Sequence, residues 1–226
     1  MSKTIVVLGA SQGIGASLVN VFAANSSNQV YALSRQLDKM QQQFQQANVY
    51  PLQLDLLTDV HDQIAALALP DKIDIVINNA GLLINKPFET ITHQDFHNSY
   101  QVNVIGIMEA TQALLPKLSA GSHIVNISSM GGFQGSLKFA GLAAYSTAKA
   151  ALCSFTEMFA EEYKESGIHM NCLCLGAVQT EMLAQAFPGY QAPTTPIEMA
   201  KYIANFAEHS GQLLNGKIIP VSASNP

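Results

Sequence analysis

The feature that most constrains the fold is a regular alternation of short apolar runs and longer helical patterns along the chain. Near-continuous apolar strands that alternate with helices are typical of a parallel sheet with helices on both faces. Seven runs are expected to be strands: Thr4–Leu8, Gln29–Leu33, Val49–Gln53, Ile73–Ile77, His123–Ile127, His169–Leu175 and Lys217–Val221. Six segments are expected to be helices: Ile14–Ala24, Leu37–Gln46, Val60–Leu67, His93–Leu118, Ala144–Ser166 and Ile197–His209. Right-handed crossovers then predict an α/β fold with one doubly wound parallel sheet.

Length and composition restrict the classes of protein further. The 226 residues show no linker, repeat or change of composition, so we expect residues 1–226 to form a single domain. With 48% hydrophobic and only 12% charged residues, the chain has the composition of a folded enzyme. A net charge of -5 without a basic stripe argues against a nucleic-acid partner. The apolar runs are too short to span a membrane, so no membrane partner is expected either.

The three cysteines, Cys153, Cys172 and Cys174, show no disulfide pattern. Cys172 and Cys174 alternate within an apolar run, which places both on one face of a buried strand. We interpret all three as reduced core thiols, which favours a reducing compartment and a cytoplasmic location. The N-terminal apolar stretch resembles a truncated signal peptide, but a glycine-rich segment follows at once, and we interpret it as the first strand.

A glycine-rich turn follows the first expected strand. Gly9, Gly13 and Gly15 have the spacing Gly-x-x-x-Gly-x-Gly, with Ser11 and Ile14 between them. Glycines allow a sharp turn and close approach of the backbone to a pyrophosphate, and the helix N-terminus supplies free N–H groups. The alternative is a tight turn that binds nothing.

A second group of residues has the chemistry of an acid/base site. Tyr145 and Lys149 lie one helical turn apart, and an ammonium near a phenol is expected to lower the tyrosine pKa toward neutrality. Ser129, with Ser128, ends an expected strand at the edge where α/β proteins bind ligands. Asn103 lies inside a long apolar helical pattern, so it either distorts the helix or belongs to the site.

Together these residues resemble the short-chain dehydrogenase/reductase family over almost the whole chain. The matching features are Gly9-x-x-x-Gly13-x-Gly15, Asp55, Asn78-Asn79-Ala80-Gly81, Asn103, the strand ending Ser128-Ser129, Tyr145-x-x-x-Lys149, and Gly176 followed by Thr180. The resemblance implies a Rossmann-like dinucleotide-binding domain that carries the catalytic residues. The chain departs from the family pattern at Leu8, where a threonine is usual, and at Leu175, where a proline is usual.

The resemblance also implies a role for each residue. Tyr145 would be the catalytic acid or base, Lys149 would bind the nicotinamide ribose, Ser129 would orient the substrate oxygen, and Asn103 would hold a water in a proton relay. Asp55 would meet the adenine and Asn79 the adenosine ribose, with the segment from Gly176 to Thr180 at the carboxamide. The residues expected at the cofactor are Gly9, Ser11, Gly13, Ile14, Gly15, Ser34, Arg35, Asp55, Leu56, Asn79, Ala80, Gly81, Tyr145, Lys149, Val178 and Thr180.

The end of the second strand indicates which cofactor is bound. A site that prefers NAD has a carboxylate there for the ribose hydroxyls, whereas this chain has Ser34 and then Arg35. An arginine binds a 2′-phosphate through two hydrogen bonds, so NADP(H) is the expected cofactor. The alternative is that Arg35 is a solvated surface charge. Asp38 is expected to lie a turn into the next helix.

We expect an oxidoreductase that interconverts a small carbonyl compound and its alcohol by hydride transfer. The segments Met130–Ala144 and Met182–Tyr190 should flank the substrate; they are largely apolar, and the second should have little regular structure. In the first segment, Phe133, Leu137, Phe139 and Leu142 should form the wall, while Lys138 is the one cation that could attract an anionic substrate.

Two alternatives to this function remain. The same fold serves as a non-catalytic NADP(H)-binding sensor or scaffold, or it catalyses dehydration or epimerisation. The long helices equivalent to His93–Leu118 and Ala144–Ser166 pair between subunits in the resembled family, which implies a homodimer or homotetramer. His93 and His97 are four residues apart on a helix, but without a third ligand they predict no metal site.

Overall fold

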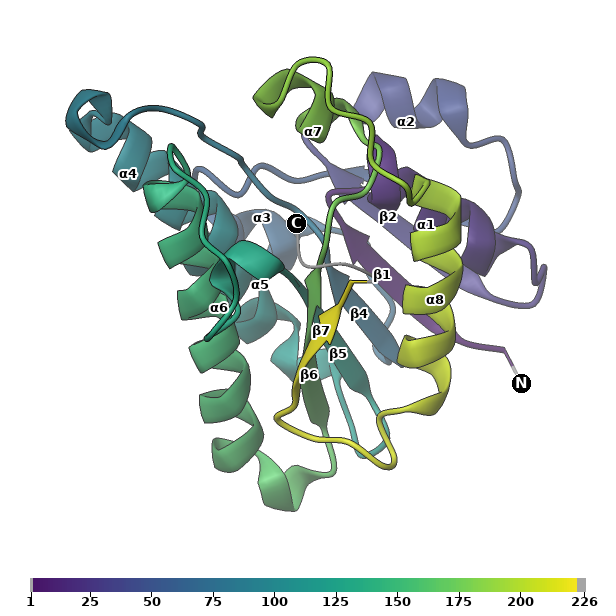
Figure 1. Ribbon diagram of the computed structural model, residues 1–226. Helices are drawn as coiled ribbons and strands as arrows, with labels where there is room; N and C mark the ends of the chain where they lie inside the picture. The colour runs from purple at the N-terminus through teal and green to yellow at the C-terminus, as the bar shows by residue number, and fades with distance from the viewer. Residues whose placement is uncertain (1, 223–226) are drawn as a thin grey trace.

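The computed structural model describes residues 2–222; Met1 and residues 223–226 of the expected domain lie outside that range. Seven parallel strands form one sheet in the order β3-β2-β1-β4-β5-β6-β7, as Figure 1 shows. The strands are β1 (Thr4–Leu8), β2 (Gln29–Ser34), β3 (Val49–Gln53), β4 (Ile75–Asn78), β5 (His123–Ser129), β6 (His169–Leu175) and β7 (Ile218–Val221). The order reverses between β1 and β4, and such a reversal opens a crevice at the carboxyl ends of the strands.

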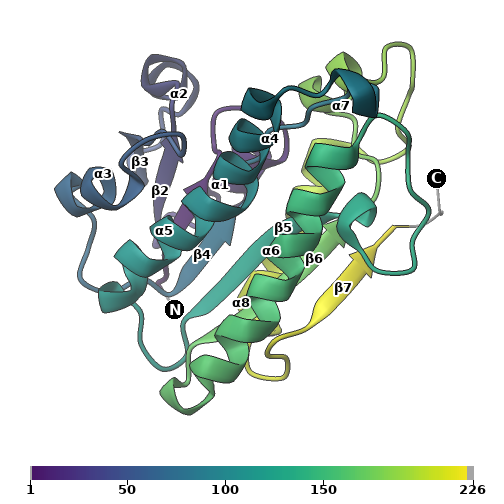
Figure 2. The same cartoon turned by 90° about the vertical axis from the view of Figure 1, so that its left-hand side faces the viewer.

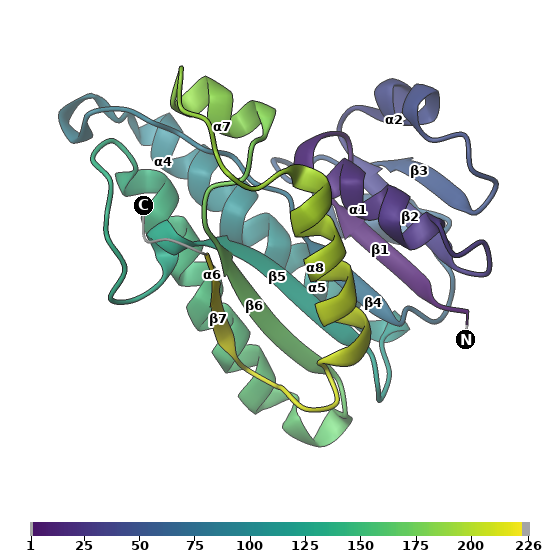
Figure 3. The same ribbon diagram turned by 45° about the vertical axis from the view of Figure 1, so that its right-hand side comes forward.

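The described residues form eight α-helices. They are α1 (Gly13–Ala23), α2 (Leu37–Gln43), α3 (Val60–Ala66), α4 (His93–Tyr100), α5 (Gly106–Leu114), α6 (Ala143–Glu162), α7 (Glu181–Ala186) and α8 (Pro196–His209). Of these, α7 lies over the carboxyl edge of the sheet, while helices on both sides cover its two faces. Figure 2 shows α4, α5 and α6 in front of the sheet, and Figure 3 shows α1 and α8 on the opposite face. The expected α/β fold with a doubly wound parallel sheet is confirmed.

The alternation of side chains along each strand divides the core into two layers. In β1, Ile5 and Val7 pack in the cluster that contains residues of α1, α2 and α8, whereas Val6 and Leu8 pack in the cluster that contains residues of α3, α5 and α6. All four side chains are fully buried. A strand buried on both faces must be apolar throughout, which explains why the sequence of β1 shows no polar alternation. Among the described residues, no helix has both the length and the apolarity of a membrane span.

The expected helix His93–Leu118 is not continuous. The α-helix α4 ends at Tyr100, the segment Gln101–Ile105 is π-helical, and α5 begins at Gly106. The amide of Asn103 donates hydrogen bonds to the carbonyls of Ser99 (2.8 Å) and Leu82 (2.9 Å). A side chain that competes for helix carbonyls in this way favours a local change of helical register. Asn103 therefore distorts the helix, one of the two options that its sequence position left open.

The segment Met182–Tyr190 was expected to have little regular structure, but the structure differs from this expectation. Its first half belongs to the short helix α7, and Thr180 caps this helix because its hydroxyl oxygen accepts a hydrogen bond of 3.2 Å from the Leu183 N–H. A side-chain cap satisfies one of the N–H groups that a helix start leaves free. Thr180 thus fixes the direction in which the chain leaves β6 and passes over the edge of the sheet.

Candidate active site

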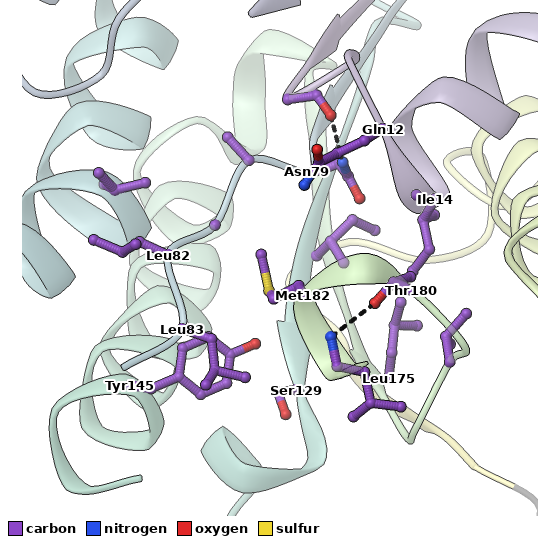
Figure 4. Close-up of a pocket in the computed structure, with 18 of the residues that line it drawn as sticks. Gln12, Ile14, Asn79, Leu82, Leu83, Ser129, Tyr145, Leu175, Thr180 and Met182 are labelled. Atoms are coloured by element: carbon purple, nitrogen blue, oxygen red, sulfur yellow. Dashed lines mark hydrogen bonds between the residues drawn. The ribbon is translucent and has the colours of Figure 1, made fainter. Parts of the chain in front are cut away.

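A cavity of about 460 Å³ lies at the carboxyl edge of the sheet, and Figure 4 shows the side chains around it. It brings together almost all of the residues singled out from the sequence. Those that line it are Gly9, Ser11, Gly13, Ile14, Ser34, Arg35, Asp55, Leu56, Asn79, Ala80, Gly81, Ser129, Tyr145, Lys149, Val178 and Thr180. Among the expected catalytic and cofactor-binding residues, Gly15 and Asn103 are the two that do not line the cavity.

The glycine-rich turn has no room for side chains. A Cβ at Gly9, whose φ is +79°, would lie 2.6 Å from the Ala80 Cα, and a Cβ at Gly15 would lie 2.0 Å from the Gly9 carbonyl oxygen. The amide of Asn79 donates a hydrogen bond of 3.0 Å to that same oxygen, as Figure 4 shows. The Asn79 amide therefore secures the turn, which is a different use of this group from the ribose contact implied by the family resemblance.

The N-terminus of α1 opens from this turn with free donors. Its capping position, Gln12, makes no side-chain hydrogen bond to the helix, and the first turn contains no acidic residue. By contrast, α4 and α8 both begin with a complete capping box. An uncapped helix start that ends at a cavity supplies N–H groups and a positive dipole end, which fit a pyrophosphate.

The opposite side of the turn meets the end of β2. The Ser34 hydroxyl donates a hydrogen bond of 2.9 Å to the Ser11 hydroxyl, which joins β2 to the glycine-rich turn. Ser34 stands where an acidic residue would be in a site for NAD, and Arg35 follows it at the cavity wall. The Lys39 ammonium bonds to the Gln12 side chain at 3.3 Å and adds a second positive charge next to this region. These two cations favour a phosphate at this end of the cavity, against the Glu181 carboxylate, whose Oε2 lies 3.6 Å from the Cβ position of Gly13.

Three polar side chains meet at the other end of the cavity. Ser129 ends β5, and α6 carries Tyr145 and Lys149 one turn apart. The Lys149 side chain is buried, and its ammonium donates a hydrogen bond of 2.9 Å to the Ile127 carbonyl. In Figure 4 the Tyr145 hydroxyl points into the cavity, with Ser129 below it. A serine hydroxyl and a phenol in one cavity can hold the oxygen of a carbonyl or alcohol between them.

The acid/base properties of these groups differ from the sequence expectation. Burial raises the pKa of Tyr145 to about 12, and the hydrogen bond with Ser129 opposes this rise. Burial also lowers the pKa of Lys149 to about 8. We expected the Lys149 ammonium to lower the tyrosine pKa toward neutrality, but Nζ lies 5.9 Å from the centroid of the phenol ring and is bonded to a carbonyl. Desolvation dominates here, so the phenol keeps its proton at neutral pH.

Asn103 acts on this centre through the segment that follows β4. Its Oδ1 accepts a hydrogen bond of 3.1 Å from the Leu82 N–H, and its amide donates to the Leu82 carbonyl. A Cβ at the neighbouring Gly81 would lie 3.2 Å from Asn103 Oδ1 and 3.5 Å from Lys149 Nζ. The missing side chain at Gly81 thus lets the Asn103 oxygen and the Lys149 ammonium approach the same point of the backbone.

The wall beyond Tyr145 is largely apolar. The side chains that form it are Leu82, Leu83, Phe139, Leu142, Met182, Leu183, Phe187 and Tyr190. Lys138 does not reach the cavity, because its ammonium bonds to the carbonyls of Gly131 (2.9 Å) and Phe133 (2.6 Å). Phe133 packs against the buried cysteines and Leu137 is 59% exposed. Contrary to the expectation from the sequence, these two side chains do not form part of the wall.

Sequence reasoning missed several of the lining residues, among them Leu82, Leu83 and Glu181. Leu82 and Leu83 directly follow Asn79-Ala80-Gly81, and their place next to that motif was the available signal. Glu181, in the first turn of α7, adds a carboxylate to the wall. Its signal was the pair Thr180-Glu181, a capping residue followed by an acid, which is typical of a helix start.

Comparison with known proteins agrees with this architecture. The family model of the short chain dehydrogenases matches residues 3–191. The chain is 31% identical over 217 residues to the oxidoreductase BOA17 of Botryotinia fuckeliana, covering 92% of this chain and 76% of that protein. It is 30% identical over 215 residues to the oxidoreductase UcpA of Escherichia coli, covering 89% and 80%.

Solved structures share the fold at lower identity. A short chain dehydrogenase from Burkholderia cenocepacia, in complex with NADP, superposes with a TM-score of 0.86 at 24% identity and covers 99% of this chain and 97% of its own. A 3-ketoacyl-(acyl-carrier-protein) reductase from Brucella melitensis, complexed with NADH, gives a TM-score of 0.86 at 21% identity, with 99% and 98% covered. The protein belongs to the short-chain dehydrogenase/reductase family of oxidoreductases.

Proposed function

We propose that this protein, as one catalytic domain over residues 1–226, is an NADP(H)-dependent oxidoreductase that interconverts a small apolar carbonyl compound and its alcohol. The observation that carries the proposal is one cavity that joins the uncapped start of α1, Arg35, the group of Ser129, Tyr145 and Lys149, and an apolar wall. The three cysteines of the chain are free and buried, which suits a reducing compartment such as the cytoplasm.

The nicotinamide cofactor supplies or accepts the hydride when it is bound. Tyr145 donates its proton to the substrate oxygen in reduction and takes it back in oxidation, and a phenol with a raised pKa is protonated and ready for the reductive direction. Ser129 holds the substrate oxygen beside this phenol. Lys149, fixed by the Ile127 carbonyl, binds the ribose hydroxyls, and Asn103 positions the Gly81–Leu82 backbone next to Lys149.

The preference for NADP(H) rests on this chain rather than on its structural neighbours, because one neighbour holds NADP and another NADH. NADPH should bind at least about tenfold more tightly than NADH, a difference of roughly 1.4 kcal/mol. Arg35→Ala should remove most of this difference, because the 2′-phosphate loses its bidentate partner. Fluorescence titration with both cofactors measures the two affinities. Lys164→Ala, far from the cavity, is the matched loss of one positive charge, and equal affinities in the unmutated protein would refute the assignment.

The apolar wall favours substrates without a second charge. A carboxylate buried there would lose its hydration without a partner. In an NADPH-oxidation screen, kcat/KM should therefore be at least about tenfold higher for hydrophobic aldehydes and ketones than for keto acids of equal length. A preference for dicarboxylates would overturn this view of the wall. NADPH binding without turnover of any carbonyl compound would instead favour the sensor or scaffold.

We also propose a homodimer or homotetramer. Several large apolar side chains on α5, α6 and the π-helical segment before α5 are exposed in the single chain: Ile105 (42%), Met108 (42%) and Met158 (63%). Buried apolar area drives association of such helices. Sedimentation at micromolar concentration should show a dimer or tetramer, and Met108→Glu combined with Met158→Glu should shift it toward monomer. The matched variant Leu213→Glu, at a side chain that is 85% exposed outside these helices, should not.

A further inference from the structure

The strongest unassigned feature is a cluster of three buried thiols behind the catalytic helix. Cys153 lies on α6, and Cys172 and Cys174 lie on β6, where the alternation of the strand turns both toward the helix. The Cys153 sulfur is 3.8 Å from that of Cys172 and 3.6 Å from that of Cys174, and all three sulfurs lie within 4.8 Å of one another. The sequence prediction that Cys172 and Cys174 share a face holds, and the helix adds a third sulfur that strand periodicity could not reveal.

We propose that Cys153, Cys172 and Cys174 form a three-thiolate binding site for a thiophilic divalent metal ion of the zinc and cadmium class. Thiolate sulfurs bound to one zinc ion at about 2.3 Å are separated from one another by about 3.8–4.0 Å. Two of the three separations are already close to that value. The binding of the ion therefore requires loss of the thiol protons and movement of the side chains around the sulfurs to make room for it.

The charges around the cluster favour a divalent ion. Three thiolates and one divalent ion carry a net charge of −1, and a buried negative charge is costly unless a cation compensates it. The Lys149 ammonium is buried on the same helix, one turn before Cys153. The complete unit of ion, thiolates and ammonium is neutral, whereas a monovalent ion would leave one negative charge uncompensated.

The donors next to the cluster suit the same ion. The Ser128 hydroxyl lies 3.4 Å from the Cys153 sulfur and supplies an oxygen for the fourth position of a tetrahedral ion. Ser128 also donates a hydrogen bond of 2.9 Å to the Lys149 carbonyl. The ion would thus connect α6, which carries Tyr145 and Lys149, to β6, which leads into the loop at Gly176.

The test uses the reduced, full-length protein and Cd²⁺ as the probe. Cd²⁺ should bind with one ion per chain and produce the ultraviolet charge-transfer absorption of a cadmium thiolate. The chain contains only these three cysteines, so this absorption can arise only from them. Because the site is buried, the measurement is repeated on protein refolded from urea with Cd²⁺ present. Bound Cd²⁺ should also raise Tm, since a ligand that binds the folded state more tightly than the unfolded state stabilises the fold.

Each of the variants Cys153→Ala, Cys172→Ala and Cys174→Ala removes one ligand and should weaken Cd²⁺ binding by more than the about 10–100-fold that loss of an outer-shell partner costs. The control His93→Gln combined with His97→Gln removes a surface pair whose ring centroids lie 6.4 Å apart and should leave the absorption unchanged. Absence of the absorption from the unmutated protein even after refolding would overturn the proposal. Cd²⁺ bound without the absorption would also overturn it, because the ion would then occupy a site elsewhere.

Discussion

Replacing Tyr145 by phenylalanine is expected to lower kcat for carbonyl reduction by about 10²–10⁴-fold, because this is the usual contribution of a positioned general acid. The variant keeps the aromatic ring and removes only the hydroxyl that faces the cavity. NADPH binding should change little, since the pyrophosphate and 2′-phosphate regions lie at the other end of the cavity. Steady-state kinetics and a fluorescence titration with NADPH measure the two effects separately.

The pKa of Tyr145 adds a dependence on pH with a definite sign. Burial raises this pKa to about 12, so the protonated phenol that reduction needs is present throughout the neutral range. Alcohol oxidation needs the phenolate, whose fraction rises with pH below the pKa. The oxidation rate should therefore increase between about pH 7 and 9, and the increase attributable to Tyr145 should have no counterpart in reduction.

The matched variant is Tyr163→Phe, which removes a phenolic hydroxyl just after the last turn of the same helix and should leave kcat unchanged. Circular dichroism of both variants controls for misfolding. If Tyr145→Phe retained more than about a tenth of the normal kcat, another group would have to donate the proton. The proposed roles of Ser129 and Lys149 would then need to be reassigned as well.

The sheet could be predicted because strands that are buried on both faces are apolar throughout, and such runs can be recognised in the sequence. The bounds of β1, β3 and β6 agree residue for residue with the expected strands, and the other strands differ by one or two residues at their ends. The break near Asn103 could not be predicted in the same way. The Asn103 side chain bonds to the Ser99 carbonyl of its own helix and is held there by two hydrogen bonds with Leu82, which is distant along the chain, and apolar periodicity contains no information about such partners.

The candidate site was predictable to the extent that it follows from the strand ends. In a parallel sheet these ends meet at one edge, so Ser129 and the segment from Asn79 to Gly81 had to lie close together. The Met130–Ala144 loop was less predictable, because its apolar residues were equivalent in sequence but only some of them face the cavity. The pKa of Tyr145 depends on the packing of the whole site, and the spacing from Lys149 alone gave the wrong direction.

The glycine at position 15 provides the second large effect. Gly15→Ala should weaken NADPH binding by at least about 100-fold, or roughly 2.7 kcal/mol. The added Cβ would lie 2.0 Å from the Gly9 carbonyl oxygen and 2.6 Å from the Asn79 amide nitrogen. The first of these atoms belongs to the backbone and cannot rotate away, so the turn itself must move, and the α1 N–H groups lose their position at the pyrophosphate.

Helix propensity acts in the opposite direction, which sharpens the test. Alanine is favoured over glycine inside a helix by up to about 1 kcal/mol. If no atoms lay close to position 15, Gly15→Ala would therefore stabilise the protein. Gly121→Ala is the matched control: its φ of +90° strains an alanine, but its Cβ would meet no atom within 4 Å. This control should lose about 1–2 kcal/mol of stability and bind NADPH normally. Normal NADPH binding by folded Gly15→Ala would show that the cofactor does not depend on this turn, and the pyrophosphate would have to be placed elsewhere in the cavity.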